Sequence, residues 1–203
     1  MKVIIIDYGM GNLFSVDSAV NYLGYKSIIT NKFDNIANAK HLILPGVGSF
    51  KKAMKIIKEK KIDKAIKLSL TKNSKVLGIC LGFQLLTSSS TEDGFTRGLS
   101  LIDKNITIFK KNSKIKIPHV GFNSVKFPKK TILFNKIKDN SDFYFVHSYK
   151  LNFSRDDKYN FSTFTHGSKY IAAFEYKNIF GTQFHPEKSQ SNGLQLIKNF
   201  LEL

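Results

Sequence analysis

Several residue types that mark common protein classes are scarce in this chain. Its 203 residues include one cysteine, four prolines and no tryptophan, and arginine occurs only as Arg97 and Arg155. A single cysteine allows no disulfide within the chain, which is typical of a protein in a reducing compartment. No segment approaches the roughly 20 apolar residues that a membrane-spanning helix requires. We therefore expect a cytoplasmic protein without a membrane partner, folded as one domain over residues 1–203.

Negative charge is also scarce, since 32 lysines and arginines face 15 aspartates and glutamates and leave a formal net charge of +17. Such a charge attracts nucleic acid, but base edges are read chiefly by arginine, which is nearly absent. The densest lysine run, residues 51–67, sets its lysines between apolar residues at helical spacing, as on the solvated face of a helix. We expect no nucleic-acid partner. One cysteine and five scattered histidines offer no metal-ligand spacing, so we expect neither a metal nor a cofactor.

Short apolar runs alternate with amphipathic segments in the first half of the chain. We expect strands over residues 2–6, 26–29, 41–44 and 75–79, and helices over 13–23, 50–57, 63–70 and 81–88. This alternation predicts a parallel sheet with helices on both faces. Shorter β-rich pieces follow at 106–109, 124–127, 143–146, 161–165, 171–175 and 179–184, before a last helix at 193–203. The predicted fold class is α/β: a three-layer sandwich around a mainly parallel central sheet with added antiparallel strands.

The cysteine stands where an apolar run meets a helical pattern, in the segment VLGICLGFQ at residues 76–84. We interpret it as a strand that turns sharply into a helix, with the thiol of Cys80 in the turn. Gly78 and Gly82 fit a turn that leaves no room for a Cβ. The helix N-terminus there favours the reactive thiolate. A free cysteine is more often a small buried apolar residue, so this segment alone does not decide for a nucleophile.

A second segment near the end of the chain supplies the partners that a cysteine nucleophile needs. The apolar run at residues 179–184 leads directly into His185-Pro186-Glu187. A histidine at the carboxyl end of a parallel strand lies where open α/β sheets bind their ligands. Glu187 is close enough in sequence to orient the imidazole ring. Nucleophile, base and orienting carboxylate predict a triad of Cys80, His185 and Glu187.

Six motifs, in this order along the chain, carry a family resemblance. They are DYGMGNL at 7–13, LPGVG at 44–48, GICLGFQ at 78–84, PHVGFN at 118–123, FVHSY at 145–149 and FHPE at 184–187. Together they resemble the class I (triad) glutamine amidotransferases, and within that family the glutaminase subunits of imidazole glycerol phosphate synthase. The resemblance spans the whole chain. It implies hydrolysis of L-glutamine to glutamate and ammonia through a γ-glutamyl thioester on Cys80.

The resemblance also implies roles for residues around the triad. Backbone N–H groups of Val47 and Leu81 would form the oxyanion hole, after a peptide flip if the resting loop is turned away. Leu81 also fits independently, because the residue after an elbow nucleophile usually supplies its N–H. Gly46 and Gly48 give the Val47 loop its freedom, although an ordinary strand-to-helix turn has the same spacing. The remaining substrate-binding residues implied are Gln84, Glu92, Ser148 and Tyr149.

Free ammonia is mostly protonated at neutral pH, so a glutaminase of this kind needs a partner that takes the ammonia directly. The resemblance implies a separate (β/α)8-barrel cyclase subunit that forms a heterodimer with this chain. The cyclase would use the ammonia to make imidazole glycerol phosphate and an aminoimidazole-carboxamide ribonucleotide in histidine biosynthesis. The implied interface comprises Gly9, Met10, Gly11, Asn12, Phe122, Asn123 and Lys188.

Two positions depart from the family pattern and leave alternatives open. Phe83 stands where the family usually has methionine, and Phe122 where it usually has tryptophan, which removes an indole N–H. These departures are compatible with a paralogue that supplies ammonia for sugar amidation in surface polysaccharide biosynthesis. A stand-alone γ-glutamyl hydrolase would share the nucleophile. A catalytically inactive regulatory subunit would lack a triad member, and none is missing.

The other histidines carry weaker expectations. We expect His147 to line the pocket in a structural or substrate-orienting role. The resemblance places His119 near the partner interface. His41 and His166 are expected at the surface or in turns.

Overall fold

The computed structural model describes residues 2–110, 115–153 and 158–203. Within them, five parallel strands form one side of the main sheet, from the edge strand β2 inward, in the order β2-β1-β3-β4-β13. Their bounds are β1 (Lys2–Ile6), β2 (Lys26–Thr30), β3 (His41–Leu44), β4 (Lys75–Ile79) and β13 (Ile179–Thr182). The first four match the predicted strands closely, because buried parallel strands read as continuous apolar runs.

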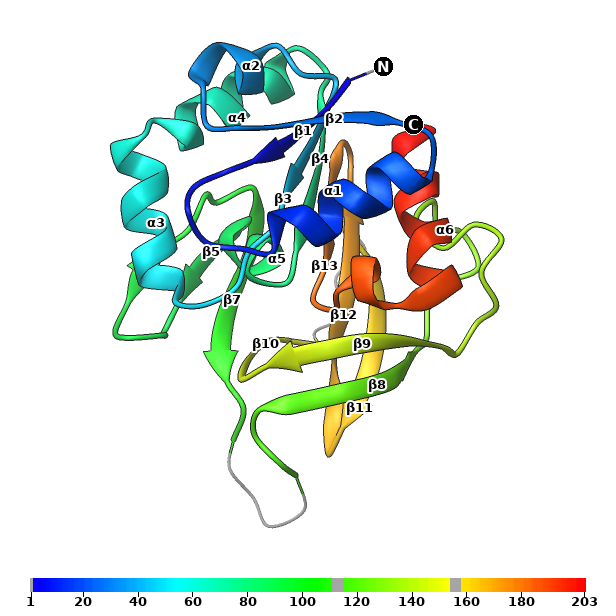
Figure 1. Cartoon of the computed structure of the whole chain (residues 1–203). Coiled ribbons are helices and arrows are strands. Elements are labelled where there is room, and N and C mark those ends of the chain that lie inside the picture. The colour runs from blue at the N-terminus through cyan, green and yellow to red at the C-terminus, as the bar shows by residue number, and fades with distance from the viewer. Residues whose placement is uncertain (1, 111–114, 154–157) are drawn as a thin grey trace.

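The sheet continues beyond β13 through strands that are mostly antiparallel. The order is β12-β10-β7-β5-β6, with β11 paired to β12. The pair β5 and β7 is parallel. The bounds are β5 (Thr87–Ser90), β6 (Thr96–Arg97), β7 (Ile102–Ile108), β10 (Tyr149–Asn152), β11 (Asn160–His166) and β12 (Ser168–Tyr176). A separate ribbon of β8 (His119–Val125) and β9 (Ser141–His147) crosses the lower part of the molecule in Figure 1.

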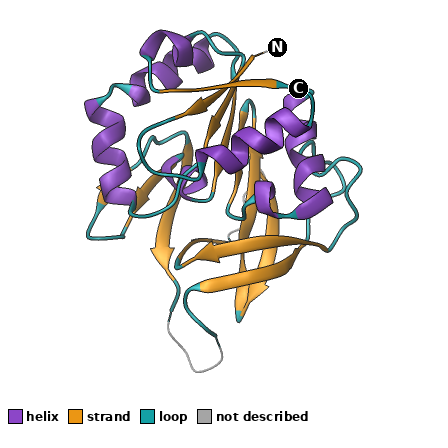
Figure 2. Cartoon of the chain, viewed as in Figure 1, coloured by secondary structure: helices purple, strands orange, loops and turns teal. Residues whose placement is uncertain are grey.

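Helices cover both faces of the sheet (Figure 2). One apolar cluster includes side chains of α2 (Phe33–Ala37), α3 (Phe50–Glu59), α4 (Ile62–Thr71) and α5 (Leu81–Leu85). The other includes side chains of α1 (Leu13–Tyr22) and α6 (Gln190–Leu201), which follows the short 3-10 helix η1 (Pro186–Lys188). The two clusters lie on opposite sides of the strands, so the molecule has the three layers that the sequence predicted. No helix in the described ranges is long and apolar enough to span a membrane.

Helix α3 contains the first part of the lysine run, and α4 contains its end. The buried residues of α3 are Phe50, Ala53, Met54 and Ile57, at the three- and four-residue spacing of one helix face. The lysines between them lie on the solvated side, as predicted. Ser49 caps the helix by accepting a hydrogen bond from the Lys52 N–H at 3.3 Å.

Several predicted boundaries are wrong. The helix expected over 81–88 ends at Leu85, because Thr87–Ser90 forms strand β5 beside β7. The strand expected over 124–127 instead begins at His119 and ends at Val125, since it pairs residue by residue with β9. The last strand ends at Thr182, and the last helix begins at Gln190. The short elements α2, β6 and β10 were missed because so few residues carry no readable period.

Candidate active site

Cys80 occupies the sharp turn between β4 and α5. Its backbone has φ 53° and ψ −105°, a conformation that non-glycine residues rarely adopt. The turn is held because the Cys80 N–H donates to the Thr182 carbonyl at 2.8 Å. A Cβ on Gly82 would lie 1.7 Å from the Leu44 carbonyl oxygen, and one on Gly78 would lie 2.7 Å from the Gly82 carbonyl carbon. The two glycines therefore make the elbow possible, as the sequence predicted.

Strand β13 brings the histidine to the same edge of the sheet. It lies parallel to β4, with Thr182 opposite Ile79, so the two carboxyl ends are neighbours. The chain continues to His185, whose N–H donates to the Tyr144 carbonyl at 2.8 Å and whose carbonyl accepts from the Ser189 hydroxyl at 2.6 Å. These bonds fix the backbone from which the ring projects.

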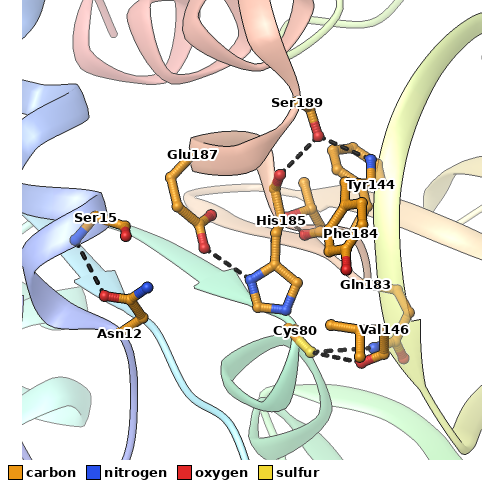
Figure 3. Close-up of polar contacts among 11 residues, drawn as sticks. Asn12, Ser15, Cys80, Tyr144, Val146, Gln183, Phe184, His185, Glu187 and Ser189 are labelled. Atoms are coloured by element: carbon orange, nitrogen blue, oxygen red, sulfur yellow. Dashed lines mark hydrogen bonds and ion pairs between the residues drawn. The ribbon is translucent and has the colours of Figure 1, made fainter. Parts of the chain in front are cut away.

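The three predicted triad residues lie together in Figure 3. The Nδ1 atom of His185 is 2.7 Å from Oε1 of Glu187, and both side chains are almost fully buried. The other ring nitrogen, Nε2, points toward Cys80 in Figure 3 and makes no hydrogen bond within the described residues. The sulfur makes two long contacts, one to the Val146 carbonyl at 3.8 Å and one from the Gln183 amide at 3.9 Å.

Electrostatics favour a charged imidazole in this arrangement. Burial lowers the pKa of His185, but the adjacent Cys80 and Glu187 outweigh burial and raise that pKa to about 10. Cys80 and Glu187 therefore favour the imidazolium form of His185, which is positioned beside the sulfur and oriented by a buried carboxylate. This pairing suits transfer of a proton between the sulfur and a leaving group.

A pocket of about 430 Å³ opens in front of the sulfur. Besides Cys80, its lining includes seven residues that were predicted for the oxyanion hole or the substrate: Val47, Gly48, Leu81, Gln84, Glu92, Ser148 and Tyr149. Gly46 belongs to the same loop but is buried and does not line the pocket. The fold thus gathers these predicted residues, from three of the motifs together with Glu92, around one thiol.

The comparisons with known proteins agree with this site. The family model described as "Glutamine amidotransferase class-I" matches residues 4–203. The chain belongs to this family. It is 45% identical over its whole length to the imidazole glycerol phosphate synthase subunit HisH 2 of Vibrio vulnificus, of which it covers 94%. It is 40% identical to subunit HisH 1 of Campylobacter jejuni, with 99% of this chain and all of the relative aligned.

Solved structures support the fold of this amidotransferase. A putative GMP synthase protein from Thermoplasma acidophilum superposes with a TM-score of 0.73 at 18% identity, covering 100% of this chain and 92% of that one. PurLQS from Thermotoga maritima gives the same TM-score at 18% identity, with coverages of 99% and 97%. At such identities the likeness concerns the fold, and the predicted fold class is confirmed.

The loop that carries Val47 leaves the amidotransferase's oxyanion hole unassembled. The Leu81 N–H, one of the two predicted donors, donates to the Gly46 carbonyl at 3.2 Å. Val47 itself is 44% exposed at the mouth of the pocket. An oxyanion can use Leu81 only after the Gly46 carbonyl has moved away, so the predicted roles of both amides stay predictions.

Two of the predicted substrate-binding side chains are engaged within the protein. The Gln84 amide donates to the Tyr149 carbonyl at 3.2 Å and to Oε1 of Gln183 at 3.0 Å, so Gln84 braces the pocket wall. Glu92 accepts from the Phe50 N–H at 2.9 Å at the start of α3, and burial raises the pKa of its carboxyl. Their contacts with glutamine remain predictions.

The predicted interface residues lie in two groups. Gly9, Met10, Gly11 and Asn12 follow β1, and the side chain of Asn12 caps α1 by accepting from the Ser15 N–H at 3.3 Å (Figure 3). Phe122 projects from β8, is 51% exposed and packs edge-on against Tyr144, with ring centres 5.6 Å apart. The Lys188 ammonium lies 5.9 Å from the same tyrosine ring. Asn123 instead turns inward and donates to the Thr165 carbonyl at 2.9 Å.

The structure corrects the placement of some histidines. His41 was expected at the surface or in a turn but is 3% exposed, packed edge-on against Phe200. His119 is also buried, with its Nδ1 3.1 Å from Nε2 of His147. His166, at the end of β11, stacks on His119 at 4.3 Å. His147 lines the pocket, as expected, and its Nδ1 donates to the Tyr149 carbonyl at 2.7 Å.

Sequence reasoning missed two residues beside the amidotransferase site. Gln183 immediately precedes Phe184 in the FHPE motif and links Cys80 to Gln84. The position of Gln183 within an apolar run could have identified it from the sequence, since a buried polar side chain needs hydrogen-bond partners. The other is Tyr8, whose hydroxyl donates to the Pro45 carbonyl at 2.8 Å behind the Val47 loop.

Proposed function

We propose that this amidotransferase is the glutaminase subunit of an imidazole glycerol phosphate synthase. The observation that carries the proposal is that Cys80 lines a pocket and has the buried, hydrogen-bonded pair of His185 and Glu187 behind it. Full-length similarity to HisH subunits favours this function over sugar amidation and over a stand-alone hydrolase. We propose further that the chain acts as one domain in the cytoplasm.

The reaction begins with attack of the Cys80 sulfur on the side-chain carbonyl carbon of glutamine. The thiolate adds to that carbon, and the resulting oxyanion requires N–H donors such as those of Val47 and Leu81. The His185 imidazolium then donates its Nε2 proton to the departing amine. The C–N bond breaks, ammonia leaves, and a γ-glutamyl thioester remains on Cys80.

Hydrolysis of the thioester returns the enzyme to its starting state. Neutral His185 accepts a proton from a water molecule, whose oxygen attacks the thioester carbonyl. Collapse of the second oxyanion breaks the C–S bond, releases glutamate and restores the thiolate–imidazolium pair. Glu187 holds the Nδ1 proton throughout, so the Nε2 atom remains the one that exchanges protons with the substrate.

The partner in this proposal is a (β/α)8-barrel cyclase that forms a heterodimer with this chain. Exposed apolar side chains support an interface at the pocket mouth: Val47 is 44% exposed, Val120 56%, Phe122 51% and Val146 36%. Val47 and Val146 line the pocket itself, and exposed apolar side chains on such a surface suit a protein contact. A barrel docked there would receive ammonia before water protonates it.

Glutamate release from glutamine tests the proposal. We expect slow release by the pure chain and strong stimulation by a cyclase barrel with its nucleotide substrate. Cys80→Ala should abolish glutamine-dependent synthesis while the complex still uses added ammonium salts, which separates loss of the nucleophile from loss of assembly. Full activity without a partner would instead identify a stand-alone hydrolase, and activity that no cyclase raises would favour another acceptor enzyme.

A further inference from the structure

Tyr8 lies directly behind the loop that must supply part of the oxyanion hole. Its side chain is 1% exposed, and its hydroxyl donates to the Pro45 carbonyl at 2.8 Å. A Cβ on Gly46 would lie 1.9 Å from that hydroxyl oxygen. The phenol therefore touches the backbone of two consecutive loop residues, Pro45 and Gly46.

Two neighbouring carbonyls of this loop are held at the same time. Tyr8 holds the Pro45 carbonyl, and the next carbonyl, that of Gly46, accepts from the Leu81 N–H at 3.2 Å. The Pro45 carbonyl belongs to the Pro45–Gly46 peptide unit, and the Gly46 carbonyl belongs to the next one, Gly46–Val47. The two units are joined at the Gly46 Cα, so anchoring the first restricts the rotation of the second. The bond from Tyr8 thus stabilises the arrangement in which the Leu81 donor is already occupied.

The segment after Tyr8 lies against the same loop. A Cβ on Gly11 would lie 3.4 Å from the Gly46 Cα, and one on Gly48 would lie 2.9 Å from the Cε of Met10. Residues 9–12 are those proposed to meet the cyclase. A partner that displaces residues 9–12 would move the Tyr8 hydroxyl relative to Pro45, because these residues directly follow Tyr8 in the chain.

Tyr8 also keeps its proton under all ordinary conditions. Burial raises the pKa of the phenol far above its usual value, and the negative charge of Cys80 raises it further. The hydroxyl is therefore a permanent donor to the Pro45 carbonyl and lies within electrostatic reach of the nucleophile.

We propose that Tyr8 is a positioning residue: its hydrogen bond to Pro45 holds the 45–48 loop in a resting arrangement in which Leu81 cannot receive an oxyanion. Release of that bond by a partner pressing on residues 9–12 frees the Leu81 N–H. The proposal rests on the proposed glutaminase function and explains how the partner would raise a low basal rate.

The test is Tyr8→Phe, which keeps the ring and removes only the hydroxyl. Loss of one buried hydrogen bond changes the balance between loop arrangements by roughly two- to tenfold. We expect basal kcat for glutamine hydrolysis by the isolated chain to rise by that factor with KM unchanged. The fully stimulated rate in the complex should stay the same, so the stimulation ratio falls. A merely structural loss would lower kcat or raise KM.

Tyr159→Phe is the matched control. Tyr159 is also buried, and its hydroxyl accepts from the Asp103 N–H at 3.0 Å, but it does not line the pocket. This variant should leave the basal kcat at the wild-type value. Hydrogen exchange of the Leu81 amide gives a readout without turnover, and it should be faster in Tyr8→Phe than in wild type and Tyr159→Phe.

An unchanged or reduced basal kcat in Tyr8→Phe, with an unchanged Leu81 exchange rate, would overturn the role of Tyr8. That result requires a wild-type chain that releases glutamate and a Cys80→Ala chain that does not. If the wild-type chain releases none, alone or with cyclase and nucleotide, the glutaminase function itself fails. The two failures are thereby distinguished.

Discussion

At the scale of single residues, the active site depends on positions that tolerate only one kind of side chain. Cys80 adopts a positive φ that a cysteine accepts only because the surrounding chain fixes it. Gly82 faces the Leu44 carbonyl with no space for a Cβ. His185 and Glu187 are two buried groups that are tolerable together because each stabilises the charge of the other.

Glu187→Gln should shift the alkaline limb of activity to lower pH. Burial lowers the pKa of His185, but Cys80 and Glu187 together raise it to about 10. The imidazolium that donates a proton to the leaving amine is thus lost as the pH rises through about 10. Without the negative charge of Glu187 the pKa of His185 is lower, so the imidazolium is deprotonated at a lower pH. The measurement is kcat for glutamine hydrolysis across the neutral and alkaline range in the wild-type and variant complexes.

The raised pKa of His185 also makes the stability of the folded chain depend on pH, and this contribution too is lost as the pH rises. A histidine pKa raised from 6.5 to about 10 stabilises the folded chain fully below pH 6.5, and the contribution disappears as the pH rises through about 10. An alkaline limb that is identical in the two enzymes would contradict the assignment of His185 as the proton donor.

Gly82→Ala should destabilise the elbow. The new Cβ would lie 1.7 Å from the Leu44 carbonyl oxygen, and such overpacking typically costs about 3 kcal/mol or somewhat less. Gly24→Ala is the control, since Gly24 has φ +84° but open space around it. The loss of unfolding free energy in Gly24→Ala should reflect backbone strain alone, about 1–2 kcal/mol. Urea unfolding measures both, and equal losses would show that the elbow adapts.

At the scale of elements, the site exists because β4 and β13 are neighbours in the sheet. Cys80 follows the first strand, and His185 comes soon after the second. In another part of the fold, hydrogen bonds hold segment 131–135 between β12 and α6. The Glu175 carboxylate accepts from the N–H groups of Ile132 and Leu133, and the Asn199 amide donates to the Leu133 carbonyl at 2.8 Å.

Glu175→Gln should loosen this segment. The carboxylate accepts from two backbone N–H groups at 3.0 and 2.8 Å, from the Thr131 hydroxyl and from Asn160. Hydrogen bonds to a charged group contribute about 1.5–3 kcal/mol, so a loss of about 2 kcal/mol in the free energy of unfolding is expected. Glu59→Gln removes an exposed carboxylate 3.9 Å from Lys55 and should change stability by less than about 0.5 kcal/mol. Chemical denaturation compares the two, and similar losses would argue against a special role for Glu175.

At the scale of the whole molecule, positive charge and buried neutral histidines act together at low pH. The formal net charge is already +17 with histidines neutral. Burial lowers the pKa of His41 and of His119 to about 4 each, and neighbouring positive groups add to the effect. Burial also lowers the pKa of His147 to about 3, despite its bond to the Tyr149 carbonyl.

Stability should therefore fall as the pH decreases from 6.5 toward about 4. The unfolded chain binds protons at these histidines in that window and the folded chain does not, so acid favours unfolding. His41→Phe removes one such site, whose two ring nitrogens have no hydrogen-bond partner in the described part of the chain. The variant should show a shallower loss of unfolding free energy with pH, by about 1.4 kcal/mol per pH unit for one full proton. Equal slopes for variant and wild type would mean that His41 titrates normally.

The sequence by itself determined the local features of this protein. Continuous apolar runs marked the parallel strands, and the lysine spacing marked the amphipathic helix α3, because both patterns depend on near neighbours in the chain. The elbow at Cys80 was readable from Gly78 and Gly82 for the same reason. Boundaries failed where pairing with a distant strand decided them, as in β5 and β8.

Only the tertiary structure decided how distant segments meet. Register between β4 and β13 set His185 beside Cys80, and packing buried His41 and His119. The tertiary structure also determines that the Leu81 N–H donates to the Gly46 carbonyl and that the Tyr8 hydroxyl donates to the Pro45 carbonyl. As a result, the predicted oxyanion hole is not formed. No local pattern carries such information, because a hydrogen bond between remote residues depends on how the whole chain folds and leaves no periodic trace in the sequence around either partner.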